Sequence, residues 1–99
     1  IVLHNDTLGM IVQLQDFFYN HHYSQCTLNK RKNLPMLAES LGVKGYAIEK
    51  QDDLIPVLKE AFAHKGPALV DIRISPEERV YPTVPGGKAL SDMILGGDA

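Results

Sequence analysis

The alternation of short apolar segments with helical patterns is the feature that most constrains how this chain can fold. The predicted strands are residues 1–4, 45–49 and 68–74, the last an apolar run of the kind buried in parallel sheets. The predicted helices are residues 9–20, residues 33–42 with Asn33 as N-cap, and a third stretch capped by Asp52 or Asp53 with Pro56 in its first turn. This order predicts an α/β fold, a three-layer parallel-sheet fragment with right-handed crossovers.

The residues after position 75 have a different character. Three prolines and the Gly86-Gly87 pair prevent a regular strand or a long helix, and only residues 88–95 have a helical pattern. We therefore divide the chain into an α/β part, residues 1–75, and an irregular C-terminal tail, residues 76–99. A tail of this kind is expected to pack across another part of the protein.

Charge and composition exclude several classes of function. A formal net charge of −2 gives no electrostatic basis for binding nucleic acid or an anionic membrane, and no apolar stretch has the length of a membrane span. The single cysteine, Cys26, excludes an internal disulfide and fits a reducing compartment. Because the chain starts at Ile1, in the middle of a predicted strand, we expect a fragment of a longer protein, with a processed mature chain as the alternative.

The segment from His4 to Met10 is the first candidate site, because it joins the first strand to the first helix. In open parallel sheets, ligands bind at the carboxyl ends of the strands, and the start of the following helix favours a phosphate. Asn5 offers a side-chain oxygen and Thr7 a backbone carbonyl, both hard ligands that suit magnesium. A plain connecting turn, which also favours Asn, Asp and Gly, remains the alternative reading of this segment.

Sequence motifs along nearly the whole chain resemble those of one enzyme family. They are Ile-Val-Leu-His-Asn-Asp-Thr-Leu-Gly-Met at 1–10, Gln-Leu-Gln at 13–15, Phe-Tyr at 18–19, Tyr-Ser at 23–24, Leu-Ala-Glu at 37–39, Gly-Val-Lys-Gly at 42–45, Gly-Pro-Ala-Leu-Val-Asp at 66–71 and Val-Tyr-Pro-Thr-Val-Pro-Gly-Gly at 80–87. In this order they resemble the large catalytic subunit of acetohydroxyacid (acetolactate) synthases. The resemblance implies that residues 1–75 are the C-terminal half of a thiamine-diphosphate-binding domain.

The resemblance also assigns roles to individual positions. Asn5 matches the second Asn of the thiamine-diphosphate signature, a magnesium ligand through its side chain, and Thr7 matches the position that lends its backbone carbonyl to the same ion. The residues expected to line the diphosphate are Asn5, Asp6, Thr7, Leu8, Gly9 and Met10. The residues expected along the substrate channel are Met10, Leu14 and Gly86, the last in a loop that covers the active-site entrance in relatives. No residue of this segment is expected to be catalytic.

Two positions depart from the family pattern. His4 stands where the first Asn of the signature usually lies, so the hydrogen bonds of that residue must differ here. Leu14 occupies the place of a tryptophan that lines the substrate channel, favours 2-ketobutyrate as second substrate and stacks on herbicidal inhibitors in relatives. Leucine at this position predicts a weaker preference for 2-ketobutyrate and poor binding of those inhibitors.

The activity implied is decarboxylation of pyruvate and transfer of the two-carbon unit to a second 2-keto acid, pyruvate or 2-ketobutyrate, in branched-chain amino-acid biosynthesis. The family's cofactors are thiamine diphosphate, Mg²⁺ and FAD, and most FAD contacts are expected outside this segment. Expected partners are the missing N-terminal domains, a second copy in a homodimer or tetramer, and a small regulatory subunit. We expect a cytoplasmic location, or plastid or mitochondrion in a eukaryote, and no activity of the chain alone.

Two alternatives stay open. One is another thiamine-diphosphate-dependent decarboxylase or carboligase, an alternative that the departure at Leu14 keeps open. The other is a non-catalytic truncated module that self-associates through an unpaired edge strand. Among the remaining residues, the adjacent His21 and His22 and the run Lys30-Arg31-Lys32 are interpreted as solvent-facing, and the predicted packing residues are Phe17, Phe18, Tyr46 and Phe62.

Overall fold

The computed structural model describes residues 1–28 and 32–96, and its centre is a small parallel sheet. The strands are β1 (Val2–His4), β2 (Lys44–Ile48) and β3 (Ala68–Arg73), in the order β1-β3-β2. The α-helices are α1 (Gly9–Phe18), α2 (Leu34–Ser40) and α3 (Leu54–Ala63), and the 3₁₀ helices are η1 (Gln51–Asp53) and η2 (Leu90–Asp92). The order of elements predicted up to residue 74 is confirmed, with ends that differ by one or two residues.

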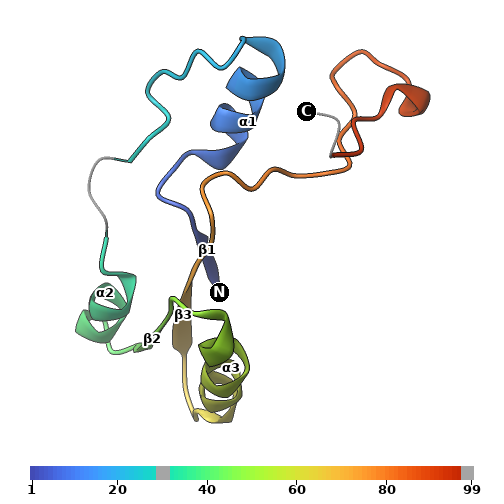
Figure 1. The fold of residues 1–99 in the computed structure, drawn as a ribbon. Helices are drawn as coiled ribbons and strands as arrows, with labels where there is room; N and C mark the ends of the chain where they lie inside the picture. Colours follow the sequence, from blue (N-terminus) through green and yellow to red (C-terminus); the bar gives the residue numbers. More distant parts are fainter. Residues whose placement is uncertain (29–31, 97–99) are drawn as a thin grey trace.

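The strand order places helices on both faces of the sheet. The chain passes from β1 through α2 to β2 at the far edge, and then returns through α3 to β3 in the middle. Because right-handed crossovers in opposite directions put their helices on opposite faces, α2 and α3 lie on either side of the strands (Figure 1). The predicted three-layer arrangement is therefore confirmed.

Local sequence signals explain where α2 and α3 begin. The side chain of Asn33 accepts a hydrogen bond from the backbone N–H of Met36 at 3.0 Å, so the predicted N-cap is confirmed. Pro56 lies in the first turn of α3, as predicted, where its missing N–H leaves no helical hydrogen bond unmade. The predicted cap position is confirmed, since Asp53 is the N-cap residue of α3. Its side chain makes no capping hydrogen bond, and the 3₁₀ turn η1 leads into the helix.

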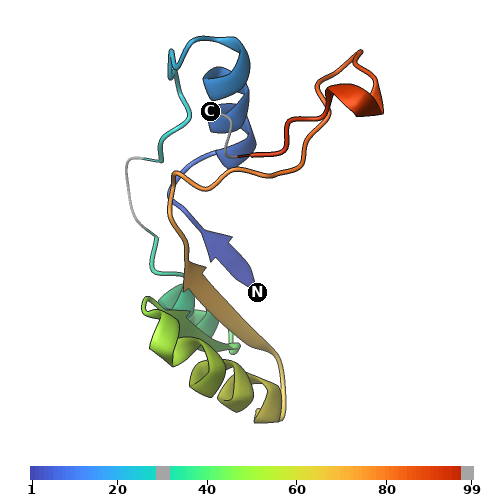
Figure 2. The same ribbon diagram turned by 45° about the vertical axis from the view of Figure 1, so that its right-hand side comes forward.

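The first helix does not cover the sheet. Figures 1 and 2 agree that α1 and the tail lie beyond the carboxyl ends of the strands, whereas α2 and α3 flank the sheet itself. The radius of gyration is 17.0 Å, whereas a compact chain of this length has a value of about 13 Å. The fold is therefore extended, with two groups of elements joined at the edge of the sheet where ligands bind in proteins of this class.

The core is correspondingly small. Its buried apolar side chains are Val12, Cys26, Ala38, Ile48 and Val70, and many large apolar side chains stay exposed. Phe17 and Tyr46 are half-buried, but Phe18 is 51% and Phe62 80% exposed, so their predicted packing role is wrong within this chain. The tail covers the side of α1 that faces away from Phe18. Phe62 lines an open apolar hollow beside Ile1. The rings of Phe18 and Phe62 are therefore available to another surface.

The tail is mostly extended, and its predicted helix at 88–95 is wrong. Only the short 3₁₀ helix η2 forms, because Ile94 pairs with Thr83 in an antiparallel bridge and Met93 is already extended. Whether the chain divides at residue 75 stays a prediction. Among the residues that the structure describes, there is no helix with the length and apolar character needed to cross a bilayer.

Candidate functional site

The turn between β1 and α1 is held in one conformation by its own side chains. The N–H of Thr7 donates to Asn5 Oδ1 at 3.1 Å, which closes a tight turn over Asp6. Asp6 has a φ of 57°, in the left-handed region that aspartate tolerates better than most residues. At Gly9 a Cβ atom would lie 3.0 Å from Asn5 Nδ2, so the first residue of α1 keeps room for the Asn5 side chain.

A second segment braces this turn from outside. Thr7 forms an isolated antiparallel bridge with Thr27, in which the N–H of Leu8 donates to the carbonyl of Cys26 and the N–H of Leu28 donates to the carbonyl of Asp6, both at 2.8 Å. In this pairing the N–H and C=O of Thr7 point away from the bracing segment. The loop that follows α1 therefore supports the candidate site.

Four charged or polar side chains lock the turn onto the middle strand, and we call them the turn cluster: His4, Asp6, Asp71 and Arg73. His4 Nδ1 lies 2.9 and 3.1 Å from the two carboxylate oxygens of Asp71, and His4 Nε2 lies 2.8 Å from Asp6 Oδ1. Arg73 Nη2 donates to Asp6 Oδ2 at 2.5 Å. The hydrogen bond from Arg73, helped by the charge of His4, lowers the pKa of Asp6 to about 2, so this carboxylate stays ionised at neutral pH.

The turn cluster explains the first departure from the family pattern. The imidazole of His4 spans the space between β3 and the turn, since its two ring nitrogens face different carboxylates. Its side chain is 10% exposed and that of Asp71 7%, so these contacts are largely shielded from water. His4 thus links two segments that are far apart in the chain, the turn and β3.

The predicted substrate-channel residues are not all brought together. Met10 and Leu14 lie one turn apart on α1 and are 55% and 43% exposed. Gly86 belongs to the loop closed by the bridge between Thr83 and Ile94, and this loop projects away from α1 in both views (Figures 1 and 2). The structure therefore places two of the three residues on one surface and the third elsewhere.

The tail packs against α1. This agrees with the expectation that the tail packs across another part of the protein. Gln13 makes a pair of hydrogen bonds with the backbone of Val80, donating to its carbonyl at 3.3 Å and accepting from its N–H at 2.7 Å. Phe17 and Tyr81 pack with ring centroids 5.7 Å apart. Asp16 accepts hydrogen bonds from Arg79 and Tyr23 and lies 3.2 Å from His21 Nδ1. His21 is exposed as predicted, yet it belongs to this contact.

Acidification is expected to loosen the tail. Burial alone would raise the pKa of Asp16, but hydrogen bonds from Tyr23, Arg79 and His21 outweigh it, and the pKa is lowered. A lowered folded-state pKa adds stability that is complete above the ordinary aspartate pKa of about 3.9 and is lost as the pH falls through the lowered value. Carbon-13 NMR of the Asp16 carboxyl group should show a pKa below the ordinary aspartate value. A pKa at or above that value would contradict this assignment.

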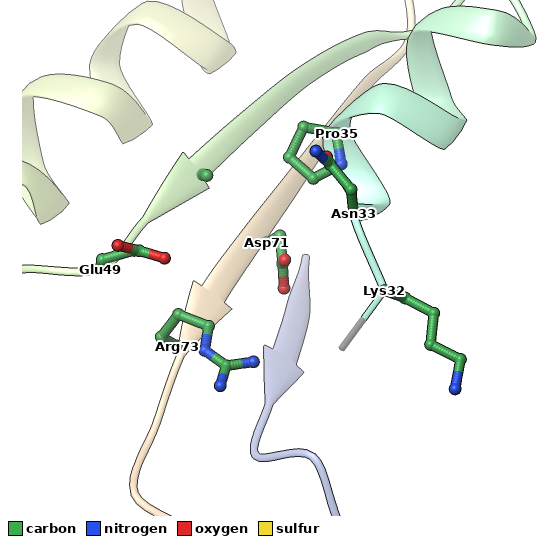
Figure 3. Close-up of a pocket in the computed structure, with 7 residues that line it drawn as sticks. Lys32, Asn33, Pro35, Glu49, Asp71 and Arg73 are labelled. Carbon is green, nitrogen blue, oxygen red and sulfur yellow. The ribbon is translucent and has the colours of Figure 1, made fainter. Parts of the chain in front are cut away.

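A hollow of about 320 Å³ lies at the carboxyl ends of β2 and β3, next to the turn cluster (Figure 3). It is lined by Lys32, Asn33, Pro35, Ala47, Glu49, Asp71 and Arg73. Two basic and two acidic side chains are among these residues, so charges of both signs line one small space. Of the basic run predicted to face solvent, Lys32 is exposed as expected, and Lys30 and Arg31 lie outside the described residues.

Two oxygen atoms of the turn fit a hard cation. Asn5 Oδ1 accepts one hydrogen bond and retains a second lone pair, and the carbonyl of Thr7 takes no part in the bridge. Thr7 Oγ1 is also buried and has no hydrogen-bond partner among the described residues. No group of three or more His, Cys, Asp or Glu side chains that could hold a metal ion occurs in the described part of the chain. The turn thus carries two oxygen atoms that could serve as ligands of a hard divalent cation, together with ligands from elsewhere.

Sequence reasoning missed Asp71 and Arg73. Both stand in a strand whose other residues are apolar, Ala68-Leu-Val-Asp-Ile-Arg73, and they occupy alternate positions that point to one face. Charged side chains on a buried strand are rare unless they are paired, which was the available signal. It did not reveal their partners, because these lie in the turn at the start of the chain.

A parallel sheet flanked by helices defines an α/β protein, and the carboxyl end of a strand, where the polar, braced turn lies, is where proteins of this class bind ligands. Residues 1–72 match the sequence model of the family described as thiamine pyrophosphate enzyme, C-terminal TPP binding domain. The chain therefore belongs to this family of thiamine pyrophosphate (thiamine diphosphate) enzymes. The match covers β1, the turn, β2 and all of β3 except its last residue, Arg73.

Curated relatives resemble the chain over almost its whole length. It is 42% identical over 95 residues to a protein named acetolactate synthase, mitochondrial, of Schizosaccharomyces pombe, and 41% identical over 96 residues to the acetolactate synthase large subunit of Haemophilus influenzae. It is 37% identical over 94 residues to the mitochondrial acetolactate synthase catalytic subunit of Saccharomyces cerevisiae. These matches cover 95–96% of this chain but only 14–17% of the relatives.

Proposed function

We propose that this chain is the C-terminal part of the thiamine-diphosphate-binding domain of an acetolactate synthase. The whole enzyme would decarboxylate pyruvate and join the two-carbon unit to a second 2-keto acid, pyruvate or 2-ketobutyrate, in branched-chain amino-acid biosynthesis. The names of the relatives and the order of the shared motifs support this activity. A different thiamine-diphosphate-dependent carboligase is the alternative.

The turn from Asn5 to Thr7 is the observation that carries this proposal. Asn5 Oδ1 and the Thr7 carbonyl would hold Mg²⁺, and the residues from Asn5 to Met10 would line the diphosphate. The first turn of α1 contains no acidic residue, so its free N–H groups would favour the diphosphate charge. When bound, thiamine diphosphate supplies the carbon chemistry, while the residues of this chain position it and shield it from water.

Several parts of the proposed enzyme lie outside this chain. FAD, the N-terminal domains, a second subunit in a homodimer or tetramer, and a small regulatory subunit are proposed from the family. The exposed apolar residues of α1 and α3 are consistent with surfaces that such partners cover. We propose a cytoplasmic enzyme, or an organellar one in a eukaryote, since two of the fungal relatives are named as mitochondrial.

The test is cofactor binding by the full-length protein, meaning the complete product of the reading frame that encodes this chain. Calorimetric titration with thiamine diphosphate and Mg²⁺ should show metal-dependent binding, and pyruvate should be converted to acetolactate. The 99-residue chain, tested in parallel, is expected to bind far more weakly because it supplies only part of the metal site. Failure of the full-length protein to bind thiamine diphosphate would overturn the proposal.

Leu14 should determine the choice of second substrate. It lies on the exposed apolar side of α1 beside Met10. A tryptophan ring at this position would enlarge the apolar surface offered to a bound substrate. Replacing Leu14 by Trp should raise the preference for 2-ketobutyrate over pyruvate by about tenfold, the scale of one added apolar contact. Competition between the two acids in the full-length enzyme measures this ratio, with Phe18→Trp on the same helix as control. Strong selectivity with Leu14 in place would refute the prediction.

Self-association is the second candidate. In the described residues β1 pairs only with β3, so its outer edge is open, and Ile1 and Leu3 beside it are 73% and 65% exposed. Sedimentation of the 99-residue chain tests this candidate, because a self-associating module would dimerise without cofactor or metal, and a monomer would contradict it.

A further inference from the structure

Two side chains of the middle strand, Asp71 and Arg73, contact the proposed cofactor turn or the residue just before it, and neither is a proposed metal ligand. Asp71 is 5% exposed and contacts His4, the last residue of β1, with both carboxylate oxygens. Arg73 pairs with Asp6 inside the turn. Both contacts join residues 67 positions apart in the sequence, so they tie the beginning of the chain to its third strand.

We propose that Asp71 and Arg73 are positioning residues that hold the Asn5–Thr7 turn in the conformation that presents its oxygen ligands to the metal ion. This inference rests on the proposed function and concerns how the same site is kept in order. Neither side chain has to touch the ion, since each acts through Asp6 or His4. Outer contacts of this kind orient the ligands of metal sites in general.

The backbone of Asp6 shows why the turn needs such support. Its φ of 57° lies in the left-handed region, which costs a non-glycine residue free energy unless neighbouring contacts compensate. The carboxylate of Asp6 makes two such contacts, with Arg73 Nη2 at 2.5 Å and His4 Nε2 at 2.8 Å. Each of its oxygens has a different partner, so the side chain cannot rotate without losing one of them.

The geometry links this support directly to the ligands. Asp6 stands between Asn5 and Thr7, and the N–H of Thr7 donates to Asn5 Oδ1 at 3.1 Å across it. A change in the Asp6 backbone would therefore move both proposed ligand oxygens relative to each other. The bridge to Thr27 fixes the turn from the outside and Arg73 fixes it from the sheet, so the ligands lie between two anchors.

The test uses the full-length protein and the concentration of Mg²⁺ that half-saturates binding of thiamine diphosphate. Arg73→Lys keeps the charge but loses the guanidinium Nη2 that donates to Asp6, and it should raise this concentration about tenfold. Asp6→Gly keeps the left-handed backbone accessible and removes the carboxylate, with a similar expected increase of about tenfold. The turnover number of Arg73→Lys at saturating Mg²⁺ should change by less than about threefold, because Arg73 is not proposed to touch the cofactor or the reacting atoms.

A double variant separates positioning from a general loss of structure. If Arg73 acts through Asp6, Arg73→Lys combined with Asp6→Gly should be no worse than the weaker-binding single variant. Arg79→Lys, which alters an arginine paired with Asp16 instead, is the matched control and should leave the Mg²⁺ requirement unchanged. Asp71→Asn, which retains an oxygen to accept from His4, should be affected less than Asp71→Ala.

The outcomes are distinguishable from failure of the proposed function. If the unsubstituted protein binds no thiamine diphosphate, the function is wrong. If it binds and Arg73→Lys and Asp6→Gly leave the Mg²⁺ requirement unchanged, or if their effects multiply in the double variant, the positioning role is overturned.

Discussion

Replacement of Gly45 by alanine is expected to destabilise the protein by about 3 kcal/mol, near the upper end of the usual cost of overpacking. Gly45 lies in β2, where a Cβ atom would stand 2.4 Å from the carbonyl oxygen and 2.6 Å from the Cα atom of Pro35. These are backbone atoms of the first turn of α2, so no side-chain rotation can relieve the clash. Thermal or urea unfolding of the full-length protein measures the effect.

The matched control is Gly86→Ala in the tail. Gly86 has no heavy atom within 4 Å of an added Cβ, and it does not adopt a positive φ. Its replacement should change the free energy of unfolding by less than about 0.5 kcal/mol. Equal unfolding of the two variants would show that α2 does not pack directly on β2 at Gly45.

Replacement of Asn5 by alanine should weaken Mg²⁺-dependent binding of thiamine diphosphate by about 100-fold or more, beyond the usual effect of an outer contact. Alanine removes Oδ1, the proposed metal ligand, and also the acceptor for the N–H of Thr7. The loss should appear in calorimetry of the full-length protein as a lower affinity in the presence of Mg²⁺.

Asn5→Asp separates the two roles of this side chain. Aspartate retains an oxygen at the same position, so the turn and the metal contact should both survive, and binding should stay within about tenfold of the unsubstituted protein. If Asn5→Ala binds the cofactor as well as the original protein does, Asn5 is a turn residue alone. The Asn-Asp-Thr segment would then be a plain connecting turn.

Much of the local structure was predictable from the sequence. The helices follow from apolar spacing, and the start of α2 follows from Asn33, whose side chain accepts from the N–H of Met36 three residues later. The turn at Asn5 was predictable for the same reason, since its bond to Thr7 spans two residues. The tail helix failed as a prediction because Ile94 pairs with Thr83, a contact that helical spacing does not encode.

The candidate site was predictable only in part. The carboxyl end of β1 and the residues from Asn5 to Met10 were identified from their place between a strand and a helix. The roles of Asp71 and Arg73 were not, although their charge in an apolar strand was visible. The partnership of Asp16 with Arg79 was equally hidden, because it depends on how the tail crosses α1.

Up to residue 74, the sequence by itself therefore determined which segments are strands, helices and turns, since these depend on contacts between residues a few positions apart. Only the tertiary structure decided that β3 lies between β1 and β2 and that its charged side chains hold the turn. The physical reason lies in the crossovers: their handedness and direction set which strands become neighbours. Two residues 67 positions apart thus come into hydrogen-bonding distance, and no local sequence pattern predicts that contact.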